Sequence, residues 1–188
     1  MSAPALETKG LVKRFGALAV SNDINFTLER GARHALIGPN GAGKTSFVNL
    51  VTGVLTPSSG EIRLAGETIT ELSRAQRVKR GLVRTFQISA LFKKLTVLEN
   101  VTLAIAEREG AANDLWRPAG HHRAIIETIE RLPADIAVLF IEHDMELVFR
   151  VAQRITVLVQ GAVLVEGAPA EIAEDPKVRQ VYLGESKH

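Results

Sequence analysis

The chain has 188 residues, which is enough for one sizeable hydrophobic core. Its 23 basic and 21 acidic residues nearly balance and 46% of its residues are apolar, which is typical of a globular domain and argues against nucleic-acid binding. It contains no cysteine, so disulfides and cysteine-ligated metals are excluded.

The first 86 residues are expected to form strands and turns with two short helices. Residues 45–52 read as a helix that ends at Gly53. Ser73 can cap a short basic helix that ends at Gly81. We expect the bases of this helix to form a solvated face; they are Arg74, Arg77, Lys79 and Arg80. The strand-like segments are 11–12, 24–28, 34–37, 62–64 and 82–86.

In the rest of the chain, helices and strands alternate. Thr96 and Glu99 fit a capping box, so a helix should run from Thr96 to about residue 109, and 125–132 is helical by periodicity. Residues 136–141 should be a strand buried on both faces, because their apolar side chains do not alternate. The expected elements that follow are a hairpin around Gly161, from 154–159 and 162–165, and short helices from 169 onward. The pattern predicts an α/β fold with a mostly parallel sheet.

One segment carries a specific chemical signal. Gly38-Pro39-Asn40-Gly41-Ala42-Gly43-Lys44-Thr45 matches the phosphate-binding pattern G-x-x-x-x-G-K-[ST]. Glycines let successive backbone N–H groups point into one concavity, and the following helix presents its positive end to the same phosphates. Lys44 should reach the β- and γ-phosphates, and the Thr45 hydroxyl should bind Mg²⁺. The strand before the loop and the helix after it argue against a chance turn. We therefore predict a nucleoside triphosphate site that also includes Ser46.

Taken with its flanks, the loop resembles the ATP-binding subunits of ABC transporters. The stretch KRFGALAVSNDINFTLERGARHALIGPNGAGKTSFVNLVTG is similar to the opening of that family. RTFQISALFKKLTVLENV and VLVEGAPAEIAEDPKVRQVYLGE look most like the branched-chain amino acid importers, with the urea-type importers as near neighbours. The resemblance covers residues 5–116 and 122–185. It implies a P-loop NTPase core with an N-terminal antiparallel β part and a truncated helical subdomain.

The resemblance also implies how the domain is organised. All 188 residues would form a single nucleotide-binding domain. Its core, with the antiparallel β part, would be 1–88 and 133–160. Residues 89–132 would be the remnant of the helical subdomain, and 161–188 a hairpin strand with C-terminal helices.

The resemblance implies roles for four residues outside the loop. Phe15 matches the aromatic residue that stacks on adenine, although by itself it reads as a core phenylalanine. Val20 matches an apolar contact near the ribose. Gln87 matches the Q-loop glutamine that reaches Mg²⁺ or the attacking water, although a lone glutamine after a strand is normally a surface residue. His143, in IEHDM, matches the switch histidine near the γ-phosphate, although a histidine beside an acid is commonly a surface or cap residue.

Three parts of the family pattern are absent between RTFQ and IEHDM. They are the signature Leu-Ser-Gly-Gly-Gln, the apolar strand that ends in Asp-Glu, and the D-loop that follows it. Glu142 ends an apolar run, but His143 follows it immediately, so we reject Glu142 as the catalytic carboxylate. The break falls within residues 116–122. The lost strand should be an interior one, and losing it would expose an edge on a flat apolar strand.

Two hypotheses of different classes follow. In the first, the chain is an ATPase subunit that binds ATP and Mg²⁺ and pairs with a second ATP-binding subunit and transmembrane permease subunits. In the second, it is a nucleotide-binding module with little or no hydrolysis. A small-molecule kinase is less favoured, since no arginine-rich lid is recognisable. No apolar run approaches the about 20 residues that span a bilayer, and MSAPALETKG is no signal peptide, so we expect a cytoplasmic protein, peripheral on the inner membrane face through its partners.

Overall fold

The computed structural model describes residues 3–84, 132–142 and 145–184. The chain divides into two compact units, 1–82 with 133–188, and 83–132. Nearly all described residues belong to the first unit. Gln87 and His143 lie outside the described residues, as do the expected helices at 96–109 and 125–131.

The N-terminal half of this unit is built on an antiparallel sheet with the strand order β2-β1-β4-β5. Strands β1 (Leu6–Phe15) and β2 (Leu18–Leu28) form a long hairpin in which Phe15 lies opposite Leu18. Strand β4 (Ser59–Leu64) pairs with the other edge of β1, and β5 (Glu67–Thr68) pairs with β4. The sequence predicted only 11–12 of β1 and 24–28 of β2, because exposed polar residues interrupt the apolar pattern near the turn.

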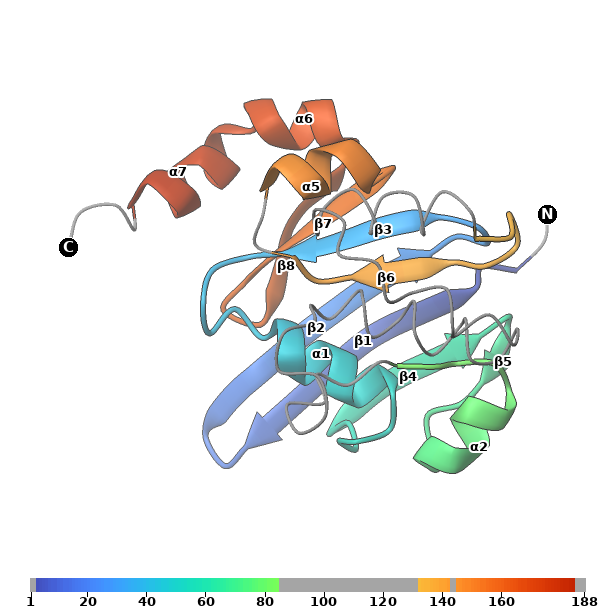
Figure 1. The fold of residues 1–188 in the computed structure, drawn as a ribbon. Helices are drawn as coiled ribbons and strands as arrows, with labels where there is room; N and C mark the ends of the chain where they lie inside the picture. The colour runs from blue at the N-terminus through green and yellow to red at the C-terminus, as the bar shows by residue number, and fades with distance from the viewer. Residues whose placement is uncertain (1–2, 85–131, 143–144, 185–188) are drawn as a thin grey trace, which may run out of the picture. The chain divides into compact units, whose positions relative to one another are not determined.

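The second sheet has the order β6-β3-β7-β8 (Figure 1). Strands β6 (Val138–Phe140) and β7 (Arg154–Val159) both pair in parallel with β3 (Arg33–Ile37), and β8 (Ala162–Gly167) pairs antiparallel with β7. The predicted hairpin around Gly161 is therefore confirmed. In β6 only Phe140 is buried, while Val138 and Leu139 are half-buried. Among the described residues β6 is the last strand of its sheet.

Two hydrophobic clusters cover the two faces of this sheet. Alternate residues of β3 face opposite clusters: Leu36 packs with α1 (Lys44–Val51) and the antiparallel sheet, whereas Ala35 and Ile37 pack with the C-terminal helices. Strand β7 divides its side chains in the same way. In Figure 1, α1 accordingly lies on one side of β3 and α5 (Met145–Val151) on the other. The last two helices are α6 (Pro169–Glu174) and α7 (Pro176–Gly184).

The helix predictions that fall on described residues hold with one correction. Helix α1 covers the expected segment, with Thr52 as its C-cap and Gly53 following at φ 74°. Helix α2 (Arg74–Lys79) begins after Ser73, whose hydroxyl accepts from the Gln76 N–H in a capping box. The prediction that Arg77 is solvated is wrong, because its side chain is buried. Arg77 is the one buried residue of α2, and backbone carbonyls surround its guanidinium.

Candidate functional site

The glycine-rich loop joins the carboxyl end of β3 to the first turn of α1. Gly38 has φ 148°, and a Cβ there would lie 2.2 Å from the carbonyl oxygen of Leu158 on β7. The loop therefore leaves the sheet through a space that admits only a glycine. This is also the sheet edge at which β6 ends, so residues after β3 and β6 meet there.

The backbone N–H groups of the first turn of α1 lie at the helix end that adjoins the loop. Its N-cap, Gly43, has φ 98°, and no side chain caps the helix. The first turn contains no acidic residue, so no carboxylate of the helix competes for the positive end of its dipole. The amides and the dipole together favour an anion at this position.

The ammonium of Lys44 lies back over the loop. Its Nζ donates to the carbonyl oxygen of Gly38 at 2.5 Å and to that of Pro39 at 2.9 Å. The side chain is 7% exposed, so the charge is held close to the loop and away from bulk water. A buried ammonium beside convergent N–H groups is a site for a compact polyanion.

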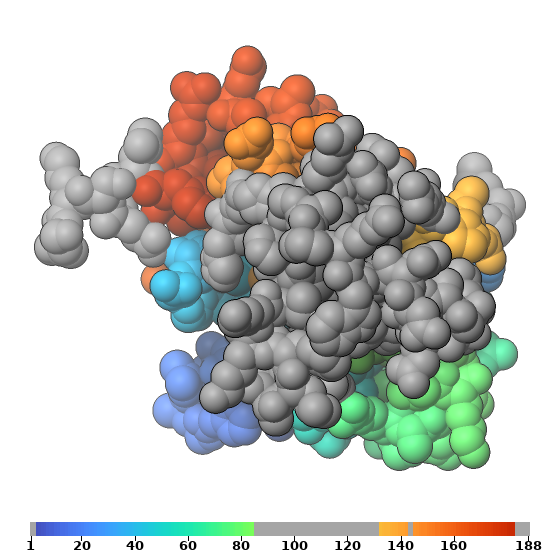
Figure 2. Space-filling view, in the orientation of Figure 1, coloured from blue at the N-terminus to red at the C-terminus, as the bar shows by residue number. Residues whose placement is uncertain are grey.

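The loop forms one wall of an open pocket of about 690 Å³, a volume in the range of small-molecule sites. Other walls come from the start of β2, the residue after β6 and the β7–β8 turn. Figure 2 shows the loop (cyan) and the tip of the β1–β2 hairpin (blue) on the same side of the molecule. The lining residues are Leu18, Ala19, Val20, Asn40, Gly41, Ala42, Gly43, Lys44, Thr45, Ser46, Ile141, Gln160 and Gly161.

Comparison with known proteins identifies the family. Residues 21–152 match the model of the ABC transporter family, and residues 162–188 match that of the branched-chain amino acid ATP-binding cassette transporter. The high-affinity branched-chain amino acid transport ATP-binding protein BraF of Pseudomonas aeruginosa is 32% identical over 99% of this chain and 100% of its own length. LivG of Escherichia coli, which has the same description, is 30% identical over the same shares. The chain belongs to the ABC transporter ATP-binding family.

Solved structures support the fold. An ATP-binding cassette of an ABC transporter in its ADP conformation matches with a TM-score of 0.80 at 22% identity, covering 97% of this chain and all of that one. A nucleotide-free ATP-binding cassette from an ABC transporter matches with a TM-score of 0.76 at 23% identity, covering 95% and 98%. The predicted fold, a P-loop NTPase core with an antiparallel β part, is confirmed. Members of this ABC family are ATPases.

The alignment also gives a minimum number of residues that are missing from this chain. It runs over 255 residues and takes in all of the Pseudomonas protein, whereas this chain has 188 residues, so at least 67 residues of the relative lie opposite no residue here. The sequence pattern places this gap between RTFQ and IEHDM, where the signature and the Asp-Glu strand of the ABC pattern are absent.

The structure brings together most of the site residues expected from the ABC resemblance. Val20 and residues 40–46 line one pocket, and Gly38 and Pro39 hold the ammonium of Lys44. Thr45 is exposed at the pocket, where its hydroxyl oxygen suits a hard cation. In the described ranges no cluster of three or more His, Cys, Asp or Glu side chains could hold a metal.

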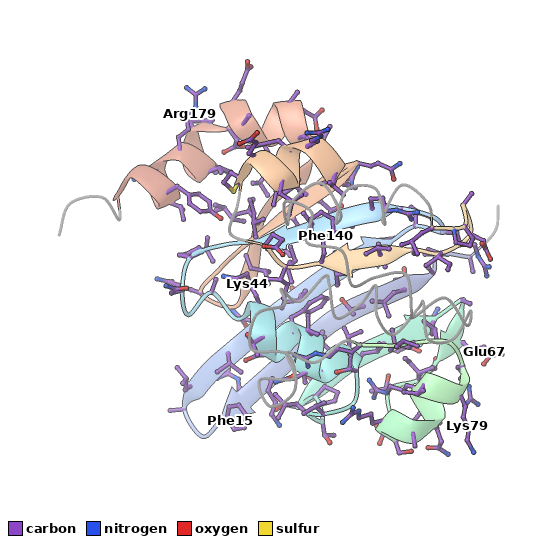
Figure 3. All side chains as sticks on the ribbon, viewed as in Figure 1. Phe15, Lys44, Glu67, Lys79, Phe140 and Arg179 are labelled. Atoms are coloured by element: carbon purple, nitrogen blue, oxygen red, sulfur yellow. The ribbon has the colours of Figure 1, made fainter. Side chains whose placement is uncertain are left out.

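Phe15 lies beside the pocket rather than in its lining. Its ring is 52% exposed at the end of β1, away from the core that the sequence alone suggested. The Nζ atom of Lys13 lies 4.9 Å from the centre of the ring, a cation–π contact that holds one face. Figure 3 shows Phe15 at the tip of the hairpin and Lys44 at the start of α1. The exposed ring is therefore open to a planar ligand.

Sequence reasoning missed five lining residues of the pocket. Ile141 follows β6 and is the first residue of IEHDM, so its place after a buried strand could have indicated it. Gln160 and Gly161 form the β7–β8 turn, and no motif joins that turn to the loop. Leu18 and Ala19 precede Val20 on the hairpin and read as ordinary strand residues.

Proposed function

We propose that this chain is the ATP-binding subunit of an ABC importer and couples ATP binding and hydrolysis to uptake of a small polar solute, with branched-chain amino acids as the favoured class. The single observation behind the nucleotide site is the loop after β3, where α1 begins without a side-chain cap and the ammonium of Lys44 lies over the same concavity. The solute class rests on the descriptions of the two relatives and of the model matched at 162–188.

Each expected site residue has its own task in this proposal. The backbone amides of 41–46 bind the phosphates, and Lys44 exchanges its carbonyl partners for phosphate oxygens. The Thr45 hydroxyl and Gln87 would hold Mg²⁺, which neutralises charge on the β- and γ-phosphates when it is bound. Phe15 stacks on adenine and Val20 contacts the ribose. His143 would hold the attacking water and stabilise developing charge.

The partners follow from the family assignment. We propose a dimer with a second ATP-binding subunit and attachment to permease subunits on the inner face of the cell membrane. Among the described helices none is long and apolar enough to cross a bilayer. Residues 83–132 would be the remnant of the helical subdomain.

A specific observation favours a second candidate, a nucleotide-binding module with little or no hydrolysis. The sequence lacks the signature and the Asp-Glu strand of the family pattern, and at least 67 residues of the Pseudomonas relative have no counterpart in this chain. In that pattern the Asp-Glu strand supplies the acids that order the metal and polarise water. Phosphate binding and water activation use different residues, so binding can survive this loss. General-base catalysis typically contributes about 10²–10⁴ to a rate.

The test is to measure ATP binding and phosphate release side by side. We expect the purified chain to bind Mg-ATP and the variant Lys44→Ala to bind at least about tenfold more weakly. Lys79→Ala, which removes an exposed lysine of α2, is the matched control and should bind like the wild type. Phosphate release that Lys44→Ala abolishes supports the ATPase, and binding with background release supports the module. A chain that binds no nucleotide contradicts both.

A further inference from the structure

The β7–β8 turn contacts the glycine-rich loop directly. Val159 pairs with Ala162, so the turn consists of Gln160 and Gly161, with φ of 50° and 80°. Two positive φ angles are what a type I′ turn requires, and they are unusual for a glutamine. Both residues line the nucleotide pocket.

Gly161 joins this turn to two other segments through its main chain. Its N–H donates to the carbonyl oxygen of Ala42 at 2.9 Å, and its own carbonyl accepts from the N–H of Asn22 at 2.8 Å. Ala42 belongs to the phosphate-binding loop, and Asn22 follows the β2 residues that line the same pocket. One residue thus connects the loop to the strand assigned to the nucleoside.

The packing at this junction leaves no space for a side chain. A Cβ on Gly161 would lie 2.8 Å from the carbonyl oxygen of Val20, and a Cβ on Gly43 would lie 2.6 Å from the same atom and 3.2 Å from the Cα of Gly161. Gly43, Gly161 and Val20 are therefore in backbone-to-backbone contact. Because Gly43 is the N-cap of α1, a shift of the turn would move the first amides of the helix.

We propose that Gly161 is a positioning residue of the nucleotide site, one that fixes the distance between the phosphate loop and the β2 wall of the pocket. The inference rests on the proposed nucleotide binding. Gly161 need not touch ATP. Its N–H and its carbonyl fix the position of Ala42 in the phosphate loop relative to that of Asn22 in β2. The distance between the part of the pocket that binds the triphosphate and the part that contacts the ribose is therefore fixed.

The first experiment compares two glycine substitutions. Gly161→Ala forces the backbone of Val20 and the loop apart, whereas Gly81→Ala places a methyl group at a similar φ of 92° with nothing within 4 Å, outside the pocket. We expect Gly161→Ala to weaken Mg-ATP binding at least about tenfold and Gly81→Ala to change it less than about twofold. Thermal unfolding without nucleotide separates a general loss of stability from a loss at the site.

Equal ATP affinity for the two variants would overturn the inference. If the wild type binds no ATP, the proposed function fails instead, so the two failures are distinguishable. Should Gly161→Ala not fold, amide hydrogen exchange of the wild type decides. Slower exchange at Gly161 and Asn22 on addition of Mg-ATP supports the positioning role of Gly161. Slower exchange confined to 41–46 contradicts it.

Discussion

The guanidinium of Arg77 lies against the last turn of α1, where its Nη1 donates to the carbonyl oxygen of Val51 at 2.6 Å. It also donates to that of Leu50 at 2.7 Å. Its other nitrogens donate to the carbonyl oxygens of Leu72 and Thr70 at 2.9 and 2.7 Å. A cation at the C-terminal end of a helix satisfies orphan carbonyls and complements the dipole. The helix with the proposed phosphate site at one end thus has Arg77 at the other.

The first prediction concerns the stability that this residue provides. Burial lowers the pKa of Arg77, and Arg77→Ala removes a donor from four carbonyl oxygens, of which only that of Leu50 keeps another, the N–H of Gly53. We expect the free energy of unfolding to fall by about 3 kcal/mol or more, since each buried unsatisfied group costs about 1–3 kcal/mol. Urea titration measures this. Lys79→Ala, on the exposed face of the same helix, should change stability by less than about 0.5 kcal/mol. Equal effects would contradict the capping role.

Arg77 also shows where sequence reasoning reaches its limit. The motif at 38–45 specifies its own conformation, so the loop, the strand before it and the helix after it were predictable from the sequence. The overall fold was predictable through the family resemblance. Arg77 was misassigned because four bases in seven residues read as a polar face, and nothing local reveals the carbonyls contributed by Leu50 and Val51. Gly161 was missed for the same reason: its partners Ala42 and Asn22 are more than a hundred residues away in the chain.

The second prediction concerns His34, which is buried on β3. Its Nε2 lies 2.8 Å from the Thr156 hydroxyl, which donates to a carboxylate oxygen of Glu166 at 2.7 Å; the hydroxyl has a single proton, so Nε2 carries the hydrogen. Burial lowers the pKa of His34 to about 4, although Glu166 raises it and Arg154 lowers it further. The folded chain therefore keeps this imidazole neutral where an unfolded histidine, with a pKa of about 6.5, takes up a proton.

The consequence is a loss of stability in acid. The contribution of His34 is fully present above pH of about 6.5 and decreases as the pH falls toward 4, with a slope of at most about 1.4 kcal/mol per pH unit. Urea unfolding at several pH values measures it. His34→Gln keeps a hydrogen-bonding group but cannot titrate. Between pH of about 6.5 and 4, the free energy of unfolding of this variant should therefore fall by about 3 kcal/mol less than that of the wild type. Parallel curves for the two proteins would contradict the assignment.

The third prediction concerns the exposed ring of Phe15. If adenine stacks on it, Phe15→Ala should weaken ATP binding about tenfold, because a stacked base contributes about 1–3 kcal/mol. Phe15→Tyr keeps the ring and should bind like the wild type. Stability should change little in either variant, since the ring is 52% exposed. Affinities from a fluorescent ATP analogue provide the measurement, and unchanged binding by Phe15→Ala would exclude stacking.

The last prediction concerns the residues missing from the alignment. Without the Asp-Glu strand and the signature, the chain should release phosphate at a rate no more than about tenfold above that of Lys44→Ala. Inserting into 116–122 the segment of the Pseudomonas relative that lies opposite the gap supplies both, and turnover should rise about 10²-fold or more if the proposed site is otherwise intact.

The matched control carries the same insert with its Asp-Glu changed to Asn-Gln, which leaves length and shape alone. Turnover in that control equal to that of the intact insert would show that the lost segment contributes folding and no chemistry. Fast release by the 188-residue chain itself would instead mean that a described acid, with Glu142 the first to test by Glu142→Gln, activates the water.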